Sequence, residues 1–174
     1  MTEIRRGTPA DIPGIAAIYD RILTEEEAGR ASVGWVRGVY PTEASAREAL
    51  EAGELFVMAE EGVLTAAARI NQTQVPVYSQ VPWRWQAPPE QVMVLHTLVV
   101  DPLWKGRGCG SAFVAFYERY ARERGCACLR MDTNEKNASA RALYARLGYR
   151  EAGIVPCAFN GIPGVGLVCL EKKL

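Results

Sequence analysis

The segment Val92–Gly110 constrains the fold of this chain more than any other. Val92–Val100 is a nearly continuous apolar run, which is typical of a central strand that is buried on both faces. An Asp-Pro pair ends the run, and a loop with glycine at alternate positions follows, Lys105-Gly106-Arg107-Gly108-Cys109-Gly110. Ser111–Arg124 then predicts a helix that a glycine closes. This order of a buried strand, a glycine-rich loop and a helix indicates an α/β fold.

The remainder of the chain shows further strand and helix patterns, without repeats, low-complexity tracts or linkers. Apolar spacing and cap residues predict strands at Thr2–Arg6, Leu55–Glu60, Val63–Ile70, Cys128–Asp132, Tyr149–Val155 and Val165–Glu171, and helices from Pro9 to about Leu23, over Thr42–Ala52 and over Asn137–Leu147. Asn71–Glu90 carries four prolines and predicts a long ordered loop. We expect one domain, residues 1–174, with a mixed sheet flanked by helices.

Composition excludes several classes of function. The 20 basic residues balance the 20 acidic ones, so nucleic acid is a poor candidate partner. The first residues are charged and no apolar run reaches the ~20 residues of a membrane span, so we expect neither a signal peptide nor a membrane anchor. Five scattered cysteines do not describe a disulfide framework and suggest a reducing cytoplasm. With one histidine and no zinc-type cysteine spacing, we expect no metal site.

The glycine loop predicts a phosphate-binding site. Glycines let backbone amides approach a ligand closely, and the following helix N-terminus adds unpaired N–H groups and a partial positive charge. Lys105 and Arg107 supply full charges. A P-loop would need a Gly-Lys-Ser/Thr ending, whereas the chain reads Gly108-Cys109-Gly110-Ser111. A dinucleotide fingerprint would want glycine or alanine at Ser111, early in a βαβ unit. A glycine-rich turn without a ligand is the remaining alternative.

Two motifs resemble those of the GNAT superfamily of acyl-CoA-dependent N-acetyltransferases. Leu98–Gly110 is similar to motif A of the family, Arg/Gln-x-x-Gly-x-Gly/Ala, with Lys105 at the Arg/Gln position. Asn137–Tyr149 resembles the second motif, Asn-x-x-Ala-x-x-x-Tyr-x-x-x-Gly-Phe/Tyr. Together the two motifs cover about fifty residues in the order and spacing of the family. The resemblance implies a GNAT-like fold, with a central mixed and mostly antiparallel sheet, and an N-acetyltransferase that uses acetyl-CoA.

The same resemblance implies where acetyl-CoA binds. The pyrophosphate would lie on the backbone amides from Arg107 to Ser111, including those of Gly108, Cys109 and Gly110. The pantetheine arm would pair with the main chain of Leu98, Val99 and Val100. Lys105 and Gly106 belong to the same loop, Asn137 would contact the cofactor arm, and Tyr144 would stand near the thioester sulfur.

Aminolysis of a thioester needs a base for the amine and a proton for the departing thiolate. Tyr144 is the predicted proton donor, although an ordinary packed helix tyrosine would give the same pattern. His96 lies in the buried strand, on one face with Leu98 and Val100 by simple alternation. It is either the base, directly or through water, or a hydrogen-bonded core residue, and position alone leaves both open.

The acceptor is predicted to be a small molecule with a primary amine. Aromatic and polar residues of the early and late segments are candidates for its site: Trp35, Tyr40, Tyr78, Trp83, Phe159 and Asn160. Such side chains either stack on a ring or hold an ammonium group, or they pack at the core edge. The runner-up function is a non-catalytic acyl-CoA sensor or partner subunit of the same fold. A homodimer is compatible with the sequence, which does not define the oligomeric state.

Overall fold

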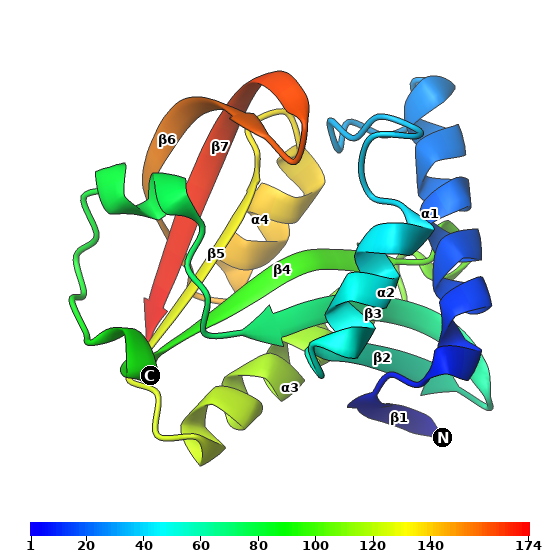
Figure 1. The fold of residues 1–174 in the computed structure, drawn as a ribbon, viewed down its shortest axis with the longest axis horizontal. Helices are drawn as coiled ribbons and strands as arrows, with labels where there is room; N and C mark the ends of the chain where they lie inside the picture. The colour runs from blue at the N-terminus through cyan, green and yellow to red at the C-terminus, as the bar shows by residue number, and fades with distance from the viewer.

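One seven-stranded sheet with helices on both faces forms the protein in the computed structural model, which describes all 174 residues (Figure 1). The strands are β1 Thr2–Arg6, β2 Leu55–Glu60, β3 Val63–Asn71, β4 Val92–Val100, β5 Cys128–Asn134, β6 Arg150–Phe159 and β7 Ile162–Lys173. The helices are α1 Ile12–Glu27, α2 Glu43–Glu51, α3 Cys109–Glu123 and α4 Ala138–Arg146. None of these helices is both long enough and apolar enough to cross a membrane.

The strand order is β1-β2-β3-β4-β5-β7-β6, and only the β4–β5 pair is parallel. The other neighbouring strands pair antiparallel. The predicted fold class, a mixed and mostly antiparallel sheet flanked by helices, is therefore confirmed.

The central strands β4 and β5 separate halfway along their length. Their ladder pairs Val92–Leu95 with Cys128–Met131 and then ends, while β4 stays paired with β3, and β5 with β7. Figure 1 shows the two strands close together near the C-terminus and apart at their other ends. The backbone of β4 beyond Leu95 therefore has no partner strand on the β5 side.

A bulge in β4 corrects one expectation from the sequence. The β3–β4 register shifts opposite Thr97, and Thr97 has a φ of 52°, a left-handed conformation that a β-branched residue rarely adopts. Leu98 and Val100 pack with the apolar cluster under α3, as Leu95 does, whereas His96 lies on the opposite face. Simple alternation fails here because the extra residue reverses the direction of the side chains that follow it.

Two apolar clusters fix the helices on the two faces of the sheet. The cluster on one face includes Phe113 and Tyr117 of α3 and Tyr144 of α4. The cluster on the other face contains Ile15 of α1 and Ala46 of α2, each at most 1% exposed. Apolar spacing of three and four residues along α1 gives it this buried stripe, and Thr42 caps α2 by accepting a hydrogen bond from the Ser45 backbone.

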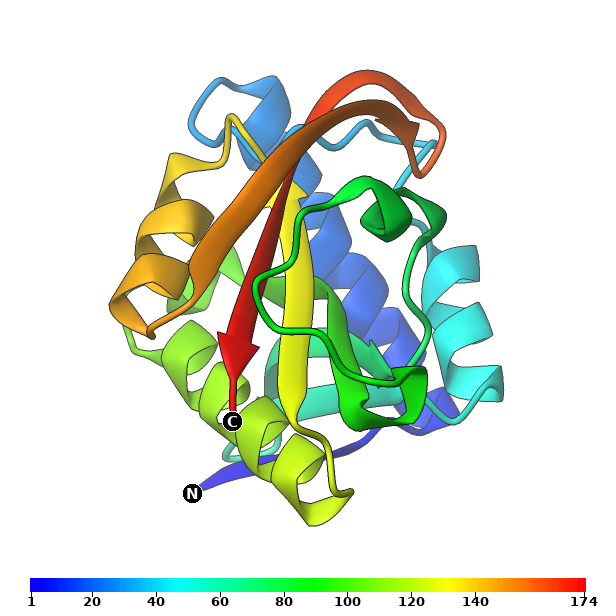
Figure 2. The same ribbon diagram turned by 90° about the vertical axis from the view of Figure 1, so that its left-hand side faces the viewer.

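The predicted loop between β3 and β4 packs over β5 and β7 (Figure 2). It contains two short 3-10 turns, Pro76–Gln80 and Pro89–Gln91. Tyr78 and Trp83 of this loop are 2% and 8% exposed and belong to a third apolar cluster with residues of β4, β5 and β7. The loop thus covers the β5 and β7 part of the sheet face on which α1 and α2 lie.

Helix α1 and strands β6 and β7 are longer than the sequence predicts. Helix α1 continues to Glu27, and the Glu26 carboxylate accepts hydrogen bonds from the backbones of Val33 and Gly34, which holds the chain after the helix. Strands β6 and β7 extend to a two-residue turn, Asn160-Gly161, in which both residues have positive φ, 52° and 77°. This turn geometry matches the twist of a hairpin, so pairing continues to the tip.

Candidate functional site

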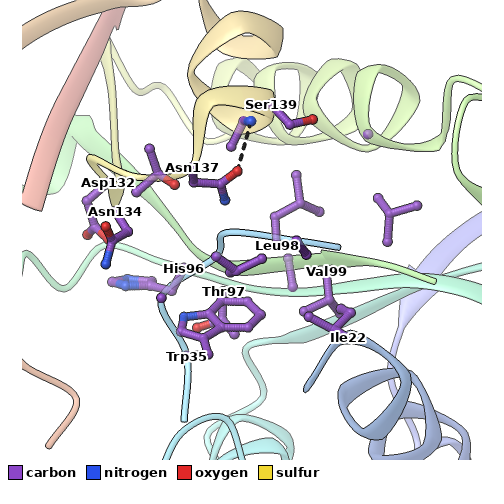
Figure 3. A pocket seen from close by; sticks show the side chains of 18 of the residues that line it. Ile22, Trp35, His96, Thr97, Leu98, Val99, Asp132, Asn134, Asn137 and Ser139 are labelled. Atoms are coloured by element: carbon purple, nitrogen blue, oxygen red, sulfur yellow. Dashed lines mark hydrogen bonds between the residues drawn. The ribbon is translucent and has the colours of Figure 1, made fainter. Parts of the chain in front are cut away.

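A cavity of about 1330 Å³ opens where β4 and β5 separate (Figure 3). Its lining comes from β4, β5, the glycine loop, α4, the chain between α1 and α2, and the tip of the β6–β7 hairpin. The cavity joins segments that are far apart in the sequence, and it contains most of the predicted site residues.

The glycine loop presents open backbone to one end of this cavity. Gly106 and Gly108 have φ values of 78° and 76°, and a Cβ atom built on either would meet no protein atom within 4 Å. Gly108 is also the N-cap of α3, so the unpaired amides of the first helical turn follow it directly. The loop therefore leaves room for an anionic group against the helix N-terminus.

Gly110 has a different role in the same loop. A Cβ atom at this position would lie 3.0 Å from Cδ2 of Leu143. The third glycine of the predicted motif therefore allows α3 and α4 to pack closely, and this contact joins the two motifs of the sequence.

The loop is anchored to the rest of the fold by Asp101. This carboxylate is 2% exposed and accepts hydrogen bonds from Nε and Nη2 of Arg21 at 3.0 and 2.6 Å. It also accepts a hydrogen bond from the Leu103 backbone at 3.0 Å. The end of β4 is thereby tied to α1 just before the glycines, while Lys105 and Arg107 stay exposed.

Helix α4 contributes Asn137 and Tyr144 to the cavity. Asn137 caps the helix with its Oδ1 atom, which accepts a hydrogen bond from the Ala140 backbone at 3.1 Å and leaves its NH₂ group free. Tyr144 is 6% exposed and packs edge to face on Tyr149, yet its hydroxyl makes no hydrogen bond within the protein. Burial, together with the nearby charge of Asp132, raises the pKa of Tyr144 above its ordinary value, so the hydroxyl keeps its proton.

His96 is held in a chain of polar side chains along β3. Its Nε2 atom lies 2.7 Å from Oδ1 of Asn71, and the Asn71 amide donates to the Glu54 carboxylate at 3.0 Å. This orientation of the amide makes His96 Nε2 the donor. Burial, with the charge of Arg69, lowers the pKa of His96 to about 4, so the ring is neutral at pH 7.

Asp132 is a residue of this cavity that reading the sequence did not single out. It follows Met131, the last residue of β5 that pairs with β4, just as His96 follows Leu95 on β4. Figure 3 shows His96, Asp132 and Asn134 at the same end of the cavity. Burial raises the pKa of Asp132 to about 6, although a hydrogen bond from the Tyr78 hydroxyl opposes this rise. The sequence did contain a signal for Asp132: it is a carboxylate at the end of a predicted strand, a few residues before the second motif.

The six predicted acceptor residues divide into two groups. Trp35, Tyr40, Phe159 and Asn160 line the large cavity. Trp35 and Tyr40 meet edge to face with ring centroids 6.2 Å apart, and the Tyr40 hydroxyl is hydrogen-bonded to that of Thr97. Tyr78 and Trp83 do not line it. They lie beneath the loop between β3 and β4, beside a separate cavity of about 440 Å³.

No three His, Cys, Asp or Glu side chains lie together where they could hold a metal ion, and all five cysteines are free thiols.

Comparisons with known proteins agree with this architecture. The sequence profile of the acetyltransferase (GNAT) family matches residues 18–149. The uncharacterized N-acetyltransferase YhfO of Bacillus subtilis is 30% identical over 121 residues, which cover 64% of this chain and 77% of that protein. An uncharacterized N-acetyltransferase of Methanocaldococcus jannaschii is 34% identical over 65 residues, which cover 37% of this chain but only 29% of that protein.

Solved structures share the fold over nearly the whole length. An acetyltransferase of the GNAT family from Streptococcus agalactiae superposes with a TM-score of 0.80 at 22% identity, covering 99% of this chain and 95% of that one. The structure of yncA from Salmonella typhimurium, described with its cofactor acetyl-CoA, has a TM-score of 0.70 at 18% identity and covers 99% of this chain and 94% of that one. By its sequence profile, its curated relatives and its fold, the chain belongs to the acetyltransferase (GNAT) family and is a GNAT-type N-acetyltransferase.

Proposed function

We propose that this protein transfers the acetyl group of acetyl-CoA directly to the primary amine of a small-molecule acceptor. The observation that carries the proposal is one continuous cavity. It contains the open glycine loop at one end and two groups suited to proton transfer, Asp132 and Tyr144, at the separation of β4 and β5. The family supports acetyl-CoA as the acetyl donor, and the residues that line the acceptor end support the acceptor class.

The residues of the cofactor end fit acetyl-CoA. The open space at Gly106 and Gly108 leaves the backbone amides accessible to a pyrophosphate. Lys105 lines the cavity there, and Arg107 of the same loop is exposed beside Trp104. The unpaired edge of β4 at Leu98–Val100 offers backbone donors and acceptors to the amide groups of the pantetheine arm. When bound, acetyl-CoA supplies an acetyl group activated as a thioester.

Asp132 is the group that we assign to accept the proton of the amine. An alkyl amine with a pKa near 10.4 arrives protonated at pH 7 and must lose a proton before it reacts. A general base works best when its pKa is near the working pH, and the pKa of about 6 favours Asp132 over His96, whose pKa is about 4. In the observed hydrogen bonds, His96 orients Asn71 and supports the wall of the site.

Tyr144 is the group that we assign to protonate the departing thiolate. Its raised pKa keeps the hydroxyl protonated at all working pH values, and no protein group competes for that hydroxyl as a partner. The free amide groups of Asn134 and Asn137 supply further neutral donors to the same cavity. The same assignment separates the enzyme from an acyl-CoA sensor of this fold, which would need neither Asp132 nor Tyr144.

The acceptor end favours an amine that carries no carboxylate. Five cations line the cavity: Lys105 of the glycine loop, Lys136 just before α4, Arg146 at the end of α4, Arg30 and Arg69. Of these, the two arginines outside the glycine loop and α4, Arg30 and Arg69, are already in ion pairs. Arg69 contacts Glu54 and Glu48 at 2.5 and 3.2 Å, and Arg30 contacts Glu25 at 2.8 Å. A substrate carboxylate would therefore find no free arginine beside these rings, and ionised Asp132 would repel it. The rings of Trp35, Tyr40 and Phe159 suit an apolar or aromatic body.

The test is release of CoA thiol from acetyl-CoA with a panel of amines that includes matched pairs. Phenethylamine and phenylalanine differ by one carboxylate, as do tyramine and tyrosine. We expect the amine of each pair to be turned over at least tenfold more efficiently than its amino acid. Acetyl-CoA binding is measured in parallel by titration calorimetry. Binding without thiol release for any amine would refute the transferase and favour the sensor, and a preference for the amino acids would refute the acceptor class alone.

The assignment of the base is tested in the same assay. Asp132→Asn should lower turnover by about 10²–10⁴ while acetyl-CoA affinity changes little, which is the usual effect of losing a general base. His96→Gln, which keeps a donor towards Asn71, serves as the matched variant and should retain most of the activity. The opposite ranking of the two variants would assign the proton transfer to His96.

A further inference from the structure

We propose that Tyr78 is a positioning residue for the Asp132 carboxylate, so that the loop between β3 and β4 forms the support of the catalytic centre. This inference rests on the proposed function, which assigns Asp132 as the base. It gives a role to a residue that the sequence suggested either as part of a substrate wall or as a packing residue at the core edge. Tyr78 does not line the large cavity, so it acts through Asp132 and touches neither substrate.

The contact between the two side chains is short and buried. The Tyr78 hydroxyl donates to Oδ2 of Asp132 at 2.6 Å, and Tyr78 is 2% exposed. Such a short hydrogen bond to a carboxylate is charge-assisted and is about twice as strong as a neutral one. It fixes Oδ2, which leaves Oδ1 of Asp132 free to face the cavity.

The ring of Tyr78 is itself held in place by Trp83. The two rings meet edge to face with centroids 5.2 Å apart, and the indole Nε1 of Trp83 donates to the Tyr78 carbonyl at 2.9 Å. The guanidinium carbon of Arg130 lies 4.2 Å from the centroid of the Trp83 ring. Tyr78 therefore has little freedom to rotate away from Asp132.

Buried polar contacts fasten the loop to the sheet on both sides of Tyr78. Arg130 on β5 donates to Oε1 of Gln74 at 2.5 Å and to the Trp85 carbonyl at 3.0 Å. Glu171 on β7 is 1% exposed and accepts hydrogen bonds from the backbones of Arg84 and Trp85, both at 3.0 Å. Breaking one partner of a buried charged contact is strongly destabilising, so these contacts keep the loop closed over β5.

Tyr78 is the only residue whose side chain hydrogen-bonds to Asp132 in the structure. The titratable groups that face it from the packed elements are Tyr40, His96 on β4, Tyr144 on α4, Cys157 on β6 and Cys169 on β7. All are neutral at pH 7, because the pKa of His96 is low and those of the tyrosines and thiols are raised. Only the Tyr78 hydrogen bond opposes the effect of burial on the pKa of Asp132.

The sign of the effect of Tyr78→Phe follows from this arrangement. Without the donor, the ionised form of Asp132 loses stabilisation, so its pKa should rise further above about 6. A hydrogen bond to a charged group contributes about 1.5–3 kcal/mol, which corresponds to a rise of about one to two pH units. The acid limb of the kcat–pH profile should therefore move to higher pH by that amount.

The experiment compares the kcat–pH profiles of the wild type and Tyr78→Phe with saturating substrates. At pH 6 we expect turnover to fall roughly five- to fiftyfold, and at pH 9 hardly at all, since the carboxylate is then almost fully ionised again. Tyr117→Phe is the matched control. It removes the hydroxyl of another fully buried tyrosine, which donates to the carbonyls of Met93 and Arg130 and not to Asp132, and it should leave the acid limb in place.

A second measurement needs no substrate. The free energy of unfolding is measured against pH with and without Asp132→Asn, in the wild type and in each tyrosine variant. In each background, the pH at which the effect of Asp132→Asn changes gives the pKa of Asp132. We expect a higher Asp132 pKa in the Tyr78→Phe background than in the wild type. If Tyr78→Phe does not fold, Trp83→Phe is the second variant, because it removes the donor to the Tyr78 carbonyl. It should shift the acid limb of the kcat–pH profile to higher pH, by a smaller amount than Tyr78→Phe.

The outcomes separate the two proposals. If Asp132→Asn abolishes turnover but Tyr78→Phe leaves both the acid limb and the Asp132 pKa unchanged, Tyr78 is only a packing residue and this inference is overturned. If Asp132→Asn keeps full turnover, the proposed base is wrong, whatever Tyr78→Phe does. An equal reduction at every pH, without a shift of the limb, would also overturn the positioning role.

Discussion

Replacing Asp132 by asparagine should make the fold more stable at neutral pH. Burial raises the pKa of this carboxyl from 3.8 to about 6 in the folded state, so its ionised form is disfavoured by folding. Asparagine has nearly the same shape, carries no charge and still accepts a hydrogen bond from Tyr78. The ionised Asp132 that the proposed chemistry requires therefore destabilises the fold at the pH where the enzyme works.

The magnitude follows from the two pKa values. Each pH unit between the folded and unfolded pKa corresponds to about 1.36 kcal/mol, so ionised Asp132 costs about 3 kcal/mol once the pH exceeds the folded value. The folded pKa is the higher one, so the folded state binds more protons between pH 3.8 and about 6 and stability falls as pH rises through that window. The gain from Asp132→Asn should be about 3 kcal/mol at pH 8, about 1.6 kcal/mol at pH 5 and small below pH 4.

The assay is urea unfolding of the wild type and the variant at pH 5 and pH 8, without acetyl-CoA. Asp11→Asn is the matched control with the opposite sign. Arg5 donates to both oxygens of Asp11 at 2.8 and 3.0 Å, and this contact lowers the Asp11 pKa, so that variant should lose stability at pH 8 and lose less at lower pH. No stabilisation by Asp132→Asn at pH 8, or a gain of equal size at pH 5, would refute the reasoning.

Three further predictions concern the cofactor end and Tyr144. Gly108→Val should abolish acetyl-CoA binding in titration calorimetry, whereas Gly125→Val, which has a similar φ of 74° and equally open space but lies outside the cavity, should bind normally. Acetyl-CoA at one hundred times its Kd should stabilise the fold by about 2.7 kcal/mol in thermal unfolding, and an unchanged Tm at saturation would exclude specific binding. Tyr144→Phe should lower turnover by about 10²-fold with acetyl-CoA affinity nearly unchanged, and by less at lower pH; wild-type turnover would make Tyr144 a packing residue.

The local parts of the protein are readable from the sequence. The apolar run of β4, the glycine loop and the helix after it follow from neighbouring residues, because glycine at 106 and 108 alone tolerates the positive φ that the loop needs. The cap of α2 and the stripe of α1 likewise follow from short-range spacing. The resemblance of the two motifs implied the fold class, and the close packing of Gly110 on Leu143 shows that the two motifs meet in the fold.

The acceptor end was decided only by the tertiary structure. Asp132 and Tyr78 are 54 residues apart in the chain, and His96 and Asn71 are 25 apart. The bulge at Thr97 turns His96 away from Leu98, and the separation of β4 from β5 opens the space that Asp132 faces. Residue spacing predicts contacts along one helix or strand. The contacts of Asp132 and His96 depend instead on how a loop and two diverging strands pack together. Burial in that packing then sets the pKa values that the chemistry requires.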